Sequence, residues 1–281
     1  MEIIHDIASI KQAIKKARQA GHTIGLVPTM GYLHEGHLSL LRQARADNQL
    51  VILSIFVNPL QFGVGEDYEE YPRDLTGDAA QAEKTGCHII FAPTVKEMYP
   101  QGYNTFVDVE KLTDGLCGAS RPGHFRGVTT VVAKLFNIVT PDRAYFGQKD
   151  AQQALVIQKM ARDLNMDLDV IIMPIIREDD GQAMSSRNAY LSHEERKAAP
   201  ILNHTLIQAA SQIQTGERDA TTIRAQIFQA ISAEPLAAID YISIVDATDL
   251  TDVIKIKGPT LIALAVRFGK TRLIDNIIVE V

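Results

Sequence analysis

The architecture of this chain is clearest in residues 23–57, TIGLVPTMGYLHEGHLSLLRQARADNQLVILSIFV. An apolar segment at residues 23–27 predicts a strand, and the glycines of residues 31–36 allow a tight turn after it. Apolar residues at helical spacing then predict a helix that begins near His37. The nearly continuous apolar run at residues 50–57 has the length of a strand covered on both faces. The order strand, turn, helix, strand is typical of a parallel sheet.

The same alternation extends through most of the chain. An amphipathic helix is expected at residues 6–20, and later segments follow in turn: helix 74–85, strand 88–91, helix 128–139, strand 144–146, helix 151–164 and strand 168–173. This pattern predicts a doubly wound α/β domain. After residue 175 come helices, at 192–214 and 220–232, and then strands at 241–245, 260–266 and 272–279. We therefore expect a first domain at residues 1–175 and a smaller α+β domain at residues 176–281.

Composition is typical of a globular protein of the cytoplasm. Lys and Arg number 28 and Asp and Glu 34, and the net charge of −6 repels a nucleic-acid backbone. Cys87 and Cys117 are too few and too far apart for a disulfide framework. No segment reaches the roughly 20 apolar residues of a membrane span, and the first residues lack the pattern of a secretion signal. We therefore expect no membrane and no nucleic-acid partner.

The turn PTMGYLHEGH, at residues 28–37, has the features of a phosphate site. It lies where a strand leads into a helix, at the end of an α/β sheet where ligands bind. Gly31 and Gly36 allow close backbone approach, the helix start offers unpaired N–H groups, and His34 and His37 lie on one side of the first turn. An ordinary glycine turn with two surface histidines is the alternative. Zinc is a weaker one, because the spacing does not match HExxH and no third ligand is evident.

Two more polar segments are candidates for contacts to phosphate. FGQKDAQQ, residues 146–153, joins a strand to a helix and places Lys149 and Gln153 at the dipole-positive end of that helix. MSSRN, residues 184–188, combines hydroxyl groups with Arg187, as a polyphosphate clamp does. The alternatives are a solvated helix start for the first segment and, for the second, a polar turn in which Asn188 caps a helix.

Three further segments are candidates for the surroundings of a substrate. Asn58 and Gln61 place uncharged amides directly after the strand at residues 50–57. Arg121, His124 and Arg126 precede an apolar helix, where they can neutralise negative charge. The Gly- and acid-rich loop at residues 63–71 is either a mobile lid over a site or a solvated surface loop.

Six ordered blocks together resemble the pantoate–β-alanine ligase (pantothenate synthetase) family of the HxGH nucleotidyltransferase superfamily. The blocks are PTMGYLHEGH at 28–37, SIFVNPLQF at 54–62, YPRD at 71–74, RPGHFRGVTTVVAKLFNIV at 121–139, FGQKDAQQ at 146–153 and MSSRN at 184–188. They run in order through the first 190 residues. The remaining length fits the family's small carboxy-terminal domain, in which we recognise no motif.

The resemblance implies a ligase that forms an amide bond in two steps. ATP adenylates the pantoate carboxylate and releases pyrophosphate, and the β-alanine amine then displaces AMP to give pantothenate, the precursor of coenzyme A. The implied fold is a Rossmann-like first domain that binds ATP and pantoate, with the second domain closing over the active site. Mg²⁺ is expected to arrive with ATP, bound mainly through its phosphates. A homodimer is also expected.

The resemblance assigns roles to individual residues. His34, His37 and Lys149 are expected to act in catalysis. The implied ATP-binding residues are Met30, Gly31, Tyr32, Leu33, His34, Glu35, Gly36, His37, Gly147, Gln148, Lys149, Asp150, Ile176, Met184, Ser185, Ser186 and Arg187. Gln61 and Gln153 correspond to pantoate ligands, and Asn58, Arg121 and His124 complete the expected substrate-binding residues. No metal-ligating residue is expected.

Other functions share some of these features. An adenylyltransferase acting on a phosphorylated acceptor has the HxGH turn, but it needs extra cations and not the pair Gln61 and Gln153. An aminoacyl-tRNA synthetase is disfavoured by the acidic charge, by MSSRN in place of a Lys-rich loop and by the missing anticodon domain. A catalytically silent nucleotide sensor is the alternative from another class, although His37 and Lys149 are both present.

Overall fold

The computed structural model describes residues 1–281, which form two compact units. Unit 1 consists of Met1–Glu110, Arg121–Gly147 and Gln153–Pro174. Unit 2 consists of Lys111–Ser120, Gln148–Gln152 and Ile175–Val281. Two short segments from the first 175 residues therefore belong to unit 2, which the sequence pattern does not reveal.

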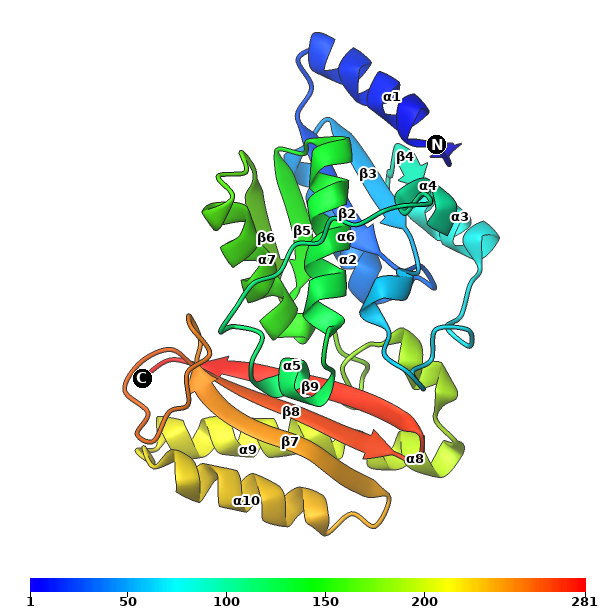
Figure 1. The fold of residues 1–281 in the computed structure, drawn as a ribbon. Helices are drawn as coiled ribbons and strands as arrows, with labels where there is room; N and C mark the ends of the chain where they lie inside the picture. The colour runs from blue at the N-terminus through cyan, green and yellow to red at the C-terminus, as the bar shows by residue number, and fades with distance from the viewer. The chain divides into compact units, whose positions relative to one another are not determined.

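Unit 1 is built on a six-stranded parallel sheet (Figure 1). Its strands are β1 (Glu2–Ile4), β2 (Ile24–Thr29), β3 (Leu50–Ile55), β4 (Ile89–Phe91), β5 (Arg143–Gly147) and β6 (Asp169–Met173), in the spatial order β1-β4-β3-β2-β5-β6. The chain runs outward from β2 to β4 and then returns to place β5 and β6 on the other side of β2. The strand order therefore reverses direction between β2 and β5. Open α/β sheets bind ligands at this topological switch point.

Helices cover both faces of this sheet, because alternate strand residues belong to two different cores. Ile24, Leu26 and Ile52 pack with α1 (Ile7–Gln19), α6 (His124–Val139) and α7 (Ala151–Asp163). Val27, Val51 and Leu53 pack with α2 (Glu35–Asp47) and α3 (Leu75–Lys84). The continuous apolar run of β3 is thus explained by burial on both faces.

Strand β2 is longer than its sequence pattern predicts. It includes Pro28 and Thr29, although the apolar segment that predicts the strand ends at residue 27. Proline lacks an N–H group, yet it is tolerated here because β2 pairs with β5 only at Gly25 and Leu26. Pro28 lies opposite Ser54 of β3. The chain therefore stays extended up to Thr29, directly before the glycine turn.

Unit 2 contains a three-stranded antiparallel sheet of β7 (Ala237–Asp246), β8 (Thr260–Phe268) and β9 (Thr271–Val279), in that order. Helices α9 (Ile201–Gln214) and α10 (Ala220–Ser232) pack on one face, around Ile262 and Leu264 (Figure 1). On the other face Leu116, from α5 (Leu116–Ser120), packs against Leu261. The single helix expected at 192–214 is instead two helices, since α8 (His193–Ala198) ends just before Pro200.

The predicted fold class, a doubly wound α/β sheet followed by a smaller α+β part, is confirmed. Elements that the sequence analysis missed are too short to show a period: β1, α4 (Val95–Met98), α5 and the 3₁₀ turns η1 (Pro59–Gln61), η2 (Gln148–Asp150) and η3 (Ser186–Tyr190). Cys87 and Cys117 are both buried and free. None of the helices is both long enough and apolar enough to cross a membrane.

Candidate functional site

The segment from Met30 to His37 joins the carboxyl end of β2 to α2. Gly31 has a φ of 85° and Tyr32 a φ of 51°, so two successive residues adopt the left-handed conformation. A Cβ atom on Gly31 would lie 2.9 Å from Oδ2 of Asp78 and 3.0 Å from Cγ2 of Ile55. Glycine is therefore required at position 31 by both conformation and space. The result is a sharp turn directly before the first turn of α2.

His34 and His37 cap the amino terminus of α2. The N–H of Gly36 donates to Nδ1 of His34 at 3.2 Å, and the N–H of His34 donates to Nδ1 of His37 at 3.3 Å. A ring nitrogen that accepts a hydrogen bond carries no proton, so the neutral form of each ring is protonated on Nε2. The ring centroids are 4.1 Å apart. The two histidines therefore form one rigid pair of Nε2–H donors at a helix start.

Asp78, on α3, fixes the backbone of the same turn. Its Oδ2 accepts from the N–H of Tyr32 at 2.9 Å, and its Oδ1 accepts from the N–H of Leu33 at 2.7 Å. Only 2% of the residue is exposed. Burial raises the pKa of this carboxyl, and the two amide hydrogen bonds offset the effect only in part. The sequence analysis missed Asp78, because one acidic residue in an amphipathic helix gives no sign of being buried.

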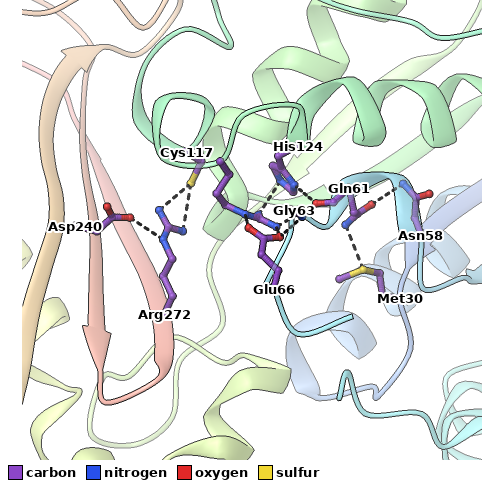
Figure 2. Close-up of polar contacts among 10 residues, drawn as sticks. Met30, Asn58, Gln61, Gly63, Glu66, Cys117, His124, Asp240 and Arg272 are labelled. Carbon is purple, nitrogen blue, oxygen red and sulfur yellow. Dashed lines mark hydrogen bonds and ion pairs between the residues drawn. The ribbon is translucent and has the colours of Figure 1, made fainter. Parts of the chain in front are cut away.

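Gln61 lies at the centre of a group of polar contacts in unit 1 (Figure 2). Its Nε2 is 3.2 Å from Sδ of Met30, and its Oε1 accepts from Nδ2 of Asn58 at 3.0 Å. Asn58 is 1% exposed; it also donates to the carbonyl of Gly127 at 3.1 Å and accepts from the hydroxyl of Tyr99 at 2.8 Å. The structure therefore brings Met30, Asn58 and Gln61 together, although 31 residues separate Met30 from Gln61.

Arg121 and His124 lie beside Gln61, at the start of α6. Nε and Nη2 of Arg121 donate to the two carboxylate oxygens of Glu66, at 2.7 and 2.6 Å. Nη1 of Arg121 is 3.0 Å from Nε2 of His124, whose Nδ1 is 2.8 Å from the carbonyl oxygen of Gln61. Because a guanidinium only donates and a carbonyl only accepts, His124 is neutral and carries its proton on Nδ1. Burial alone raises the pKa of Glu66, but Arg121 outweighs it and lowers that pKa to about 2.

In unit 2, Lys149 lies in the 3₁₀ turn η2. Its side chain is 21% exposed, and its Nζ is 3.9 Å from Oδ2 of Asp150. Asn276 of β9 donates from Nδ2 to the carbonyl oxygens of Gln148 and Lys149, at 2.9 and 3.0 Å. Nε2 of Gln148 donates back to Oδ1 of Asn276 at 3.3 Å. Asn276 therefore fixes the backbone that carries Lys149, in a part of the sequence where we recognised no motif.

The remaining nucleotide-binding candidates of unit 2 lie together. The N–H of Met184 donates to the carbonyl of Ile176 at 3.0 Å. Oγ of Ser185 accepts from the N–H of Arg187 at 3.2 Å and so caps η3, whose first residue is Ser186. Asn188 does not cap a helix: it lies inside η3, and the cap of α8 is Ser192.

A buried ion pair supports this segment. Arg177 donates to both carboxylate oxygens of Asp275, at 2.7 and 2.9 Å, and to the carbonyl of Gly181 at 3.0 Å. The side chain of Asp275 is 1% exposed. Asp275 and Asn276 are neighbours on β9, so one strand anchors both polar segments of unit 2.

Other predicted residues have simpler surroundings. Gly147 ends β5, Gln153 is half-buried in the first turn of α7, and Glu35 forms an ion pair with Arg42. Arg126 stacks on Phe106, with its guanidinium 4.1 Å from the ring centroid. No group of three or more His, Cys, Asp or Glu side chains is placed to hold a metal ion. In unit 1, the start of α2 presents hydrogen-bond donors, which suit phosphate and carboxylate oxygens.

The model of the family described as pantoate-beta-alanine ligase matches residues 2–278. A protein named pantothenate synthetase from Heliobacterium modesticaldum is 60% identical over 281 residues and covers 100% of both chains. Its namesake from Acetivibrio thermocellus is 59% identical, with the same coverage.

Solved structures agree with these relatives. The crystal structure of pantothenate synthetase from Thermus thermophilus has a TM-score of 0.94 and 45% identity, and the match covers 99% of each chain. The pantoate-beta-alanine ligase from Francisella tularensis, crystallised with beta-gamma ATP and beta-alanine, has a TM-score of 0.80 and 32% identity, covering 99% of this chain and 97% of the other. The resemblance stated from six sequence blocks is confirmed, together with the ligase activity that it implies: this chain belongs to the pantoate–β-alanine ligase family.

Proposed function

We propose that this ligase joins pantoate to β-alanine through a pantoyl-adenylate intermediate, and that the turn at residues 30–37 holds the ATP phosphates. The observation that carries the proposal is the pair His34 and His37. Each ring accepts a backbone N–H at Nδ1, which leaves Nε2–H as the donor on both rings. The pair caps α2, so its donors stand at the dipole-positive end of a helix.

Adenylation demands that two anions react, since the pantoate carboxylate attacks the α-phosphorus of ATP. Negative charge accumulates on the phosphate oxygens in the transition state, and fixed donors stabilise it there. We assign His37, with His34, to donation from Nε2–H, and Lys149 to the charge on the α-phosphate. Asn276 fixes the backbone that carries Lys149 through the hydrogen bond to its carbonyl oxygen at 3.0 Å.

The other nucleotide contacts follow from the same proposal. The backbone of Met30, Gly31, Tyr32 and Leu33 approaches ATP through the turn that Asp78 fixes. Glu35 and Gly36 begin α2, and Gly147 to Asp150 follow at the end of β5. Ile176 and residues 184–187 are proposed as further nucleotide contacts, and the N–H of Met184 donates to the carbonyl of Ile176. Ser185, Ser186 and Arg187 supply hydroxyl and guanidinium donors for the polyphosphate.

Gln61 and Gln153 are proposed to hold pantoate, with Asn58 supporting Gln61 through the hydrogen bond at 3.0 Å. Neutral amides suit this task. They can hold carboxylate and hydroxyl oxygens without the full positive charge that would weaken the attacking carboxylate as a nucleophile.

Mg²⁺ is proposed to enter with ATP and to be held mainly through phosphate oxygens. Mg²⁺ commonly binds in this way, with substrate phosphates and few protein carboxylates. The one buried carboxylate beside the turn, Asp78, already accepts two backbone hydrogen bonds. The donor residues at the turn are therefore suited to ATP itself.

We also propose a homodimer in the cytoplasm. Two-fold symmetric dimers are the commonest oligomers of globular proteins, and the free thiols of Cys87 and Cys117 suit a reducing compartment. Sedimentation at micromolar concentration is expected to give twice the mass of the 31.0 kDa chain. A single species at the mass of one chain would reject the dimer.

The adenylate route has a direct test. The enzyme is expected to exchange labelled pyrophosphate into ATP when pantoate is present and β-alanine absent, and to show little exchange without pantoate. ¹⁸O from the pantoate carboxylate is expected in AMP once β-alanine is added. Label in orthophosphate, with ADP as the nucleotide product, would indicate an acyl-phosphate route and contradict the proposed roles of His34, His37 and Lys149.

A further inference from the structure

Arg121 is already occupied by a carboxylate of its own chain. Both oxygens of Glu66 are bonded to its guanidinium, at 2.7 and 2.6 Å. The side chains are largely buried, with exposed fractions of 16% for Arg121 and 25% for Glu66. Such a bidentate, charge-assisted pair is the strongest arrangement that a guanidinium makes with a carboxylate.

The surroundings of Arg121 form a receptor for one carboxylate. Nη1 of Arg121 faces the unprotonated Nε2 of neutral His124, and Nη2 also donates to the carbonyl of Gln61 at 3.2 Å. These contacts orient the guanidinium from two sides, while its Nε and Nη2 donate to the carboxylate of Glu66. The guanidinium is thus held by α6 and η1, whereas its carboxylate partner comes from the loop at residues 63–71.

The reaction contains one carboxylate that fits this receptor. The pantoate carboxylate loses its charge when it is adenylated, and a full cation beside it would weaken its attack. The β-alanine carboxylate takes no part in bond formation and keeps its charge through the whole reaction and in the product. A fixed Arg therefore suits β-alanine and not pantoate.

We propose that Glu66 is a built-in competitor of β-alanine: it occupies Arg121 in the absence of that substrate, and the β-alanine carboxylate displaces it. The inference rests on the proposed function and deepens it, because it makes Glu66 a residue that sets the affinity for the second substrate. Two methylene groups separate the carboxylate of β-alanine from its amine. An anchored carboxylate therefore keeps the nucleophile close to Gln61, whose carbonyl contacts Arg121.

A small turn at residues 63–66 carries Glu66. The N–H of Gly63 donates to Oε2 of Glu66 at 3.1 Å, and the N–H of Glu66 donates to the carbonyl of Gly63 at 3.2 Å. Gly65, between Gly63 and Glu66, has a φ of 81°, so this small turn depends on glycine. Arg121 lowers the pKa of Glu66 to about 2, so the competing carboxylate is charged at neutral pH.

The test is the KM for β-alanine in Glu66→Gln, which keeps the size of the side chain and removes its charge. We expect KM to fall about 3- to 10-fold, the factor that corresponds to the loss of one partly buried charge-assisted pair. Pyrophosphate exchange with ATP and pantoate, measured without β-alanine, is expected to stay at the wild-type rate. Glu69→Gln is the matched control, because Glu69 is exposed in the same loop and Arg73 bonds only its backbone carbonyl.

A second substrate separates competition from a general loosening of the loop. β-Alaninamide has the same amine and no charged carboxylate, so its KM is expected to be equal in wild type and Glu66→Gln. In an Arg121→Met background, which has no cation for either carboxylate, Glu66→Gln is expected to change the KM for β-alanine by less than about twofold. Glu66→Asp, which keeps the charge on a shorter side chain, is expected to give an intermediate KM and replaces Glu66→Gln if that variant does not fold.

Two results would overturn the inference: an unchanged or higher KM for β-alanine in Glu66→Gln, or an equal fall in KM for β-alaninamide. Neither result tests the adenylate route. That route is tested by pantoate-dependent pyrophosphate exchange in the wild-type enzyme. A wild-type enzyme with normal exchange and an unresponsive KM would refute the role of Glu66 alone.

Discussion

Replacing Asp78 by Asn separates the architecture of the phosphate turn from the stability of the fold. The carboxylate accepts two amide hydrogen bonds, at 2.9 Å from Tyr32 and 2.7 Å from Leu33. An Asn side chain offers one oxygen and turns an NH₂ group toward the second amide. One hydrogen bond to a charged group, of about 1.5–3 kcal/mol, is therefore lost.

An opposing effect limits the loss of stability. Burial raises the pKa of Asp78 above its usual value of 3.8, so ionisation of this carboxyl costs stability. The cost is absent below pH 3.8, grows as the pH rises to the raised pKa and is fully present above it. Asn carries no charge and removes this cost at neutral pH. We therefore expect the free energy of unfolding of Asp78→Asn to lie within about 2 kcal/mol of wild type.

We expect Asp78→Asn to lower the catalytic rate more than it lowers the free energy of unfolding. Tyr32 has a left-handed φ of 51°, and the lost hydrogen bond lets it relax and shift His34 and His37. A misplacement of about 1 Å in a catalytic group can cost on the order of 10²-fold in rate. We therefore expect pantoate-dependent pyrophosphate exchange to fall about 100-fold in kcat.

The assay pairs this exchange rate with urea denaturation of the same preparation. Asp74→Asn is the control, because Asp74 caps the same helix by accepting from the N–H of Gly77 at 2.9 Å and Asn caps equally well. The control is expected to keep both rate and stability. A folded Asp78→Asn enzyme with wild-type exchange would refute the reasoning, and so would loss of stability far beyond about 2 kcal/mol.

Three further predictions test other parts of the structure. Lys149→Ala and His37→Ala are each expected to lower kcat for adenylation about 10²- to 10³-fold with the fold intact; near-normal exchange in either variant would remove that residue from the mechanism. Gly127→Ala places a Cβ atom 2.2 Å from the carbonyl oxygen of Leu60, so α6 must move away from η1. We expect a loss of about 1–3 kcal/mol by urea denaturation and a higher KM for pantoate; an unchanged midpoint would contradict the close packing. Glu66 has a folded pKa of about 2, below its usual value of 4.5, so its stabilising effect relative to Glu66→Gln is present above pH 4.5 and is lost as the pH falls toward 2. Denaturation curves of the two proteins at about pH 6 and about pH 3 measure it, and a difference independent of pH would exclude the ion pair as its cause.

The sequence alone determined the layered architecture of unit 1 and the candidate turn. The apolar run of β3 and the helical spacing of α2 are local patterns, and burial imposes them wherever such elements pack. The turn PTMGYLHEGH was identifiable for a similar reason. Glycine at position 31 and histidines three residues apart are local signs of a left-handed turn and a helix start, although Asp78 of α3 then fixes that turn.

Tertiary structure alone decided which residues support these motifs. Asp78 is 45 residues from Leu33, and Asn276 is 127 residues from Lys149, so their hydrogen bonds leave no trace in the local sequence. In the sequence, Glu66 does not differ from the other acidic residues of its polar loop. Its ion pair is with Arg121, which lies 55 residues away along the chain. The physical reason is that the spacing of apolar residues reports burial within one element, whereas the partner of a buried polar group depends on how distant elements pack.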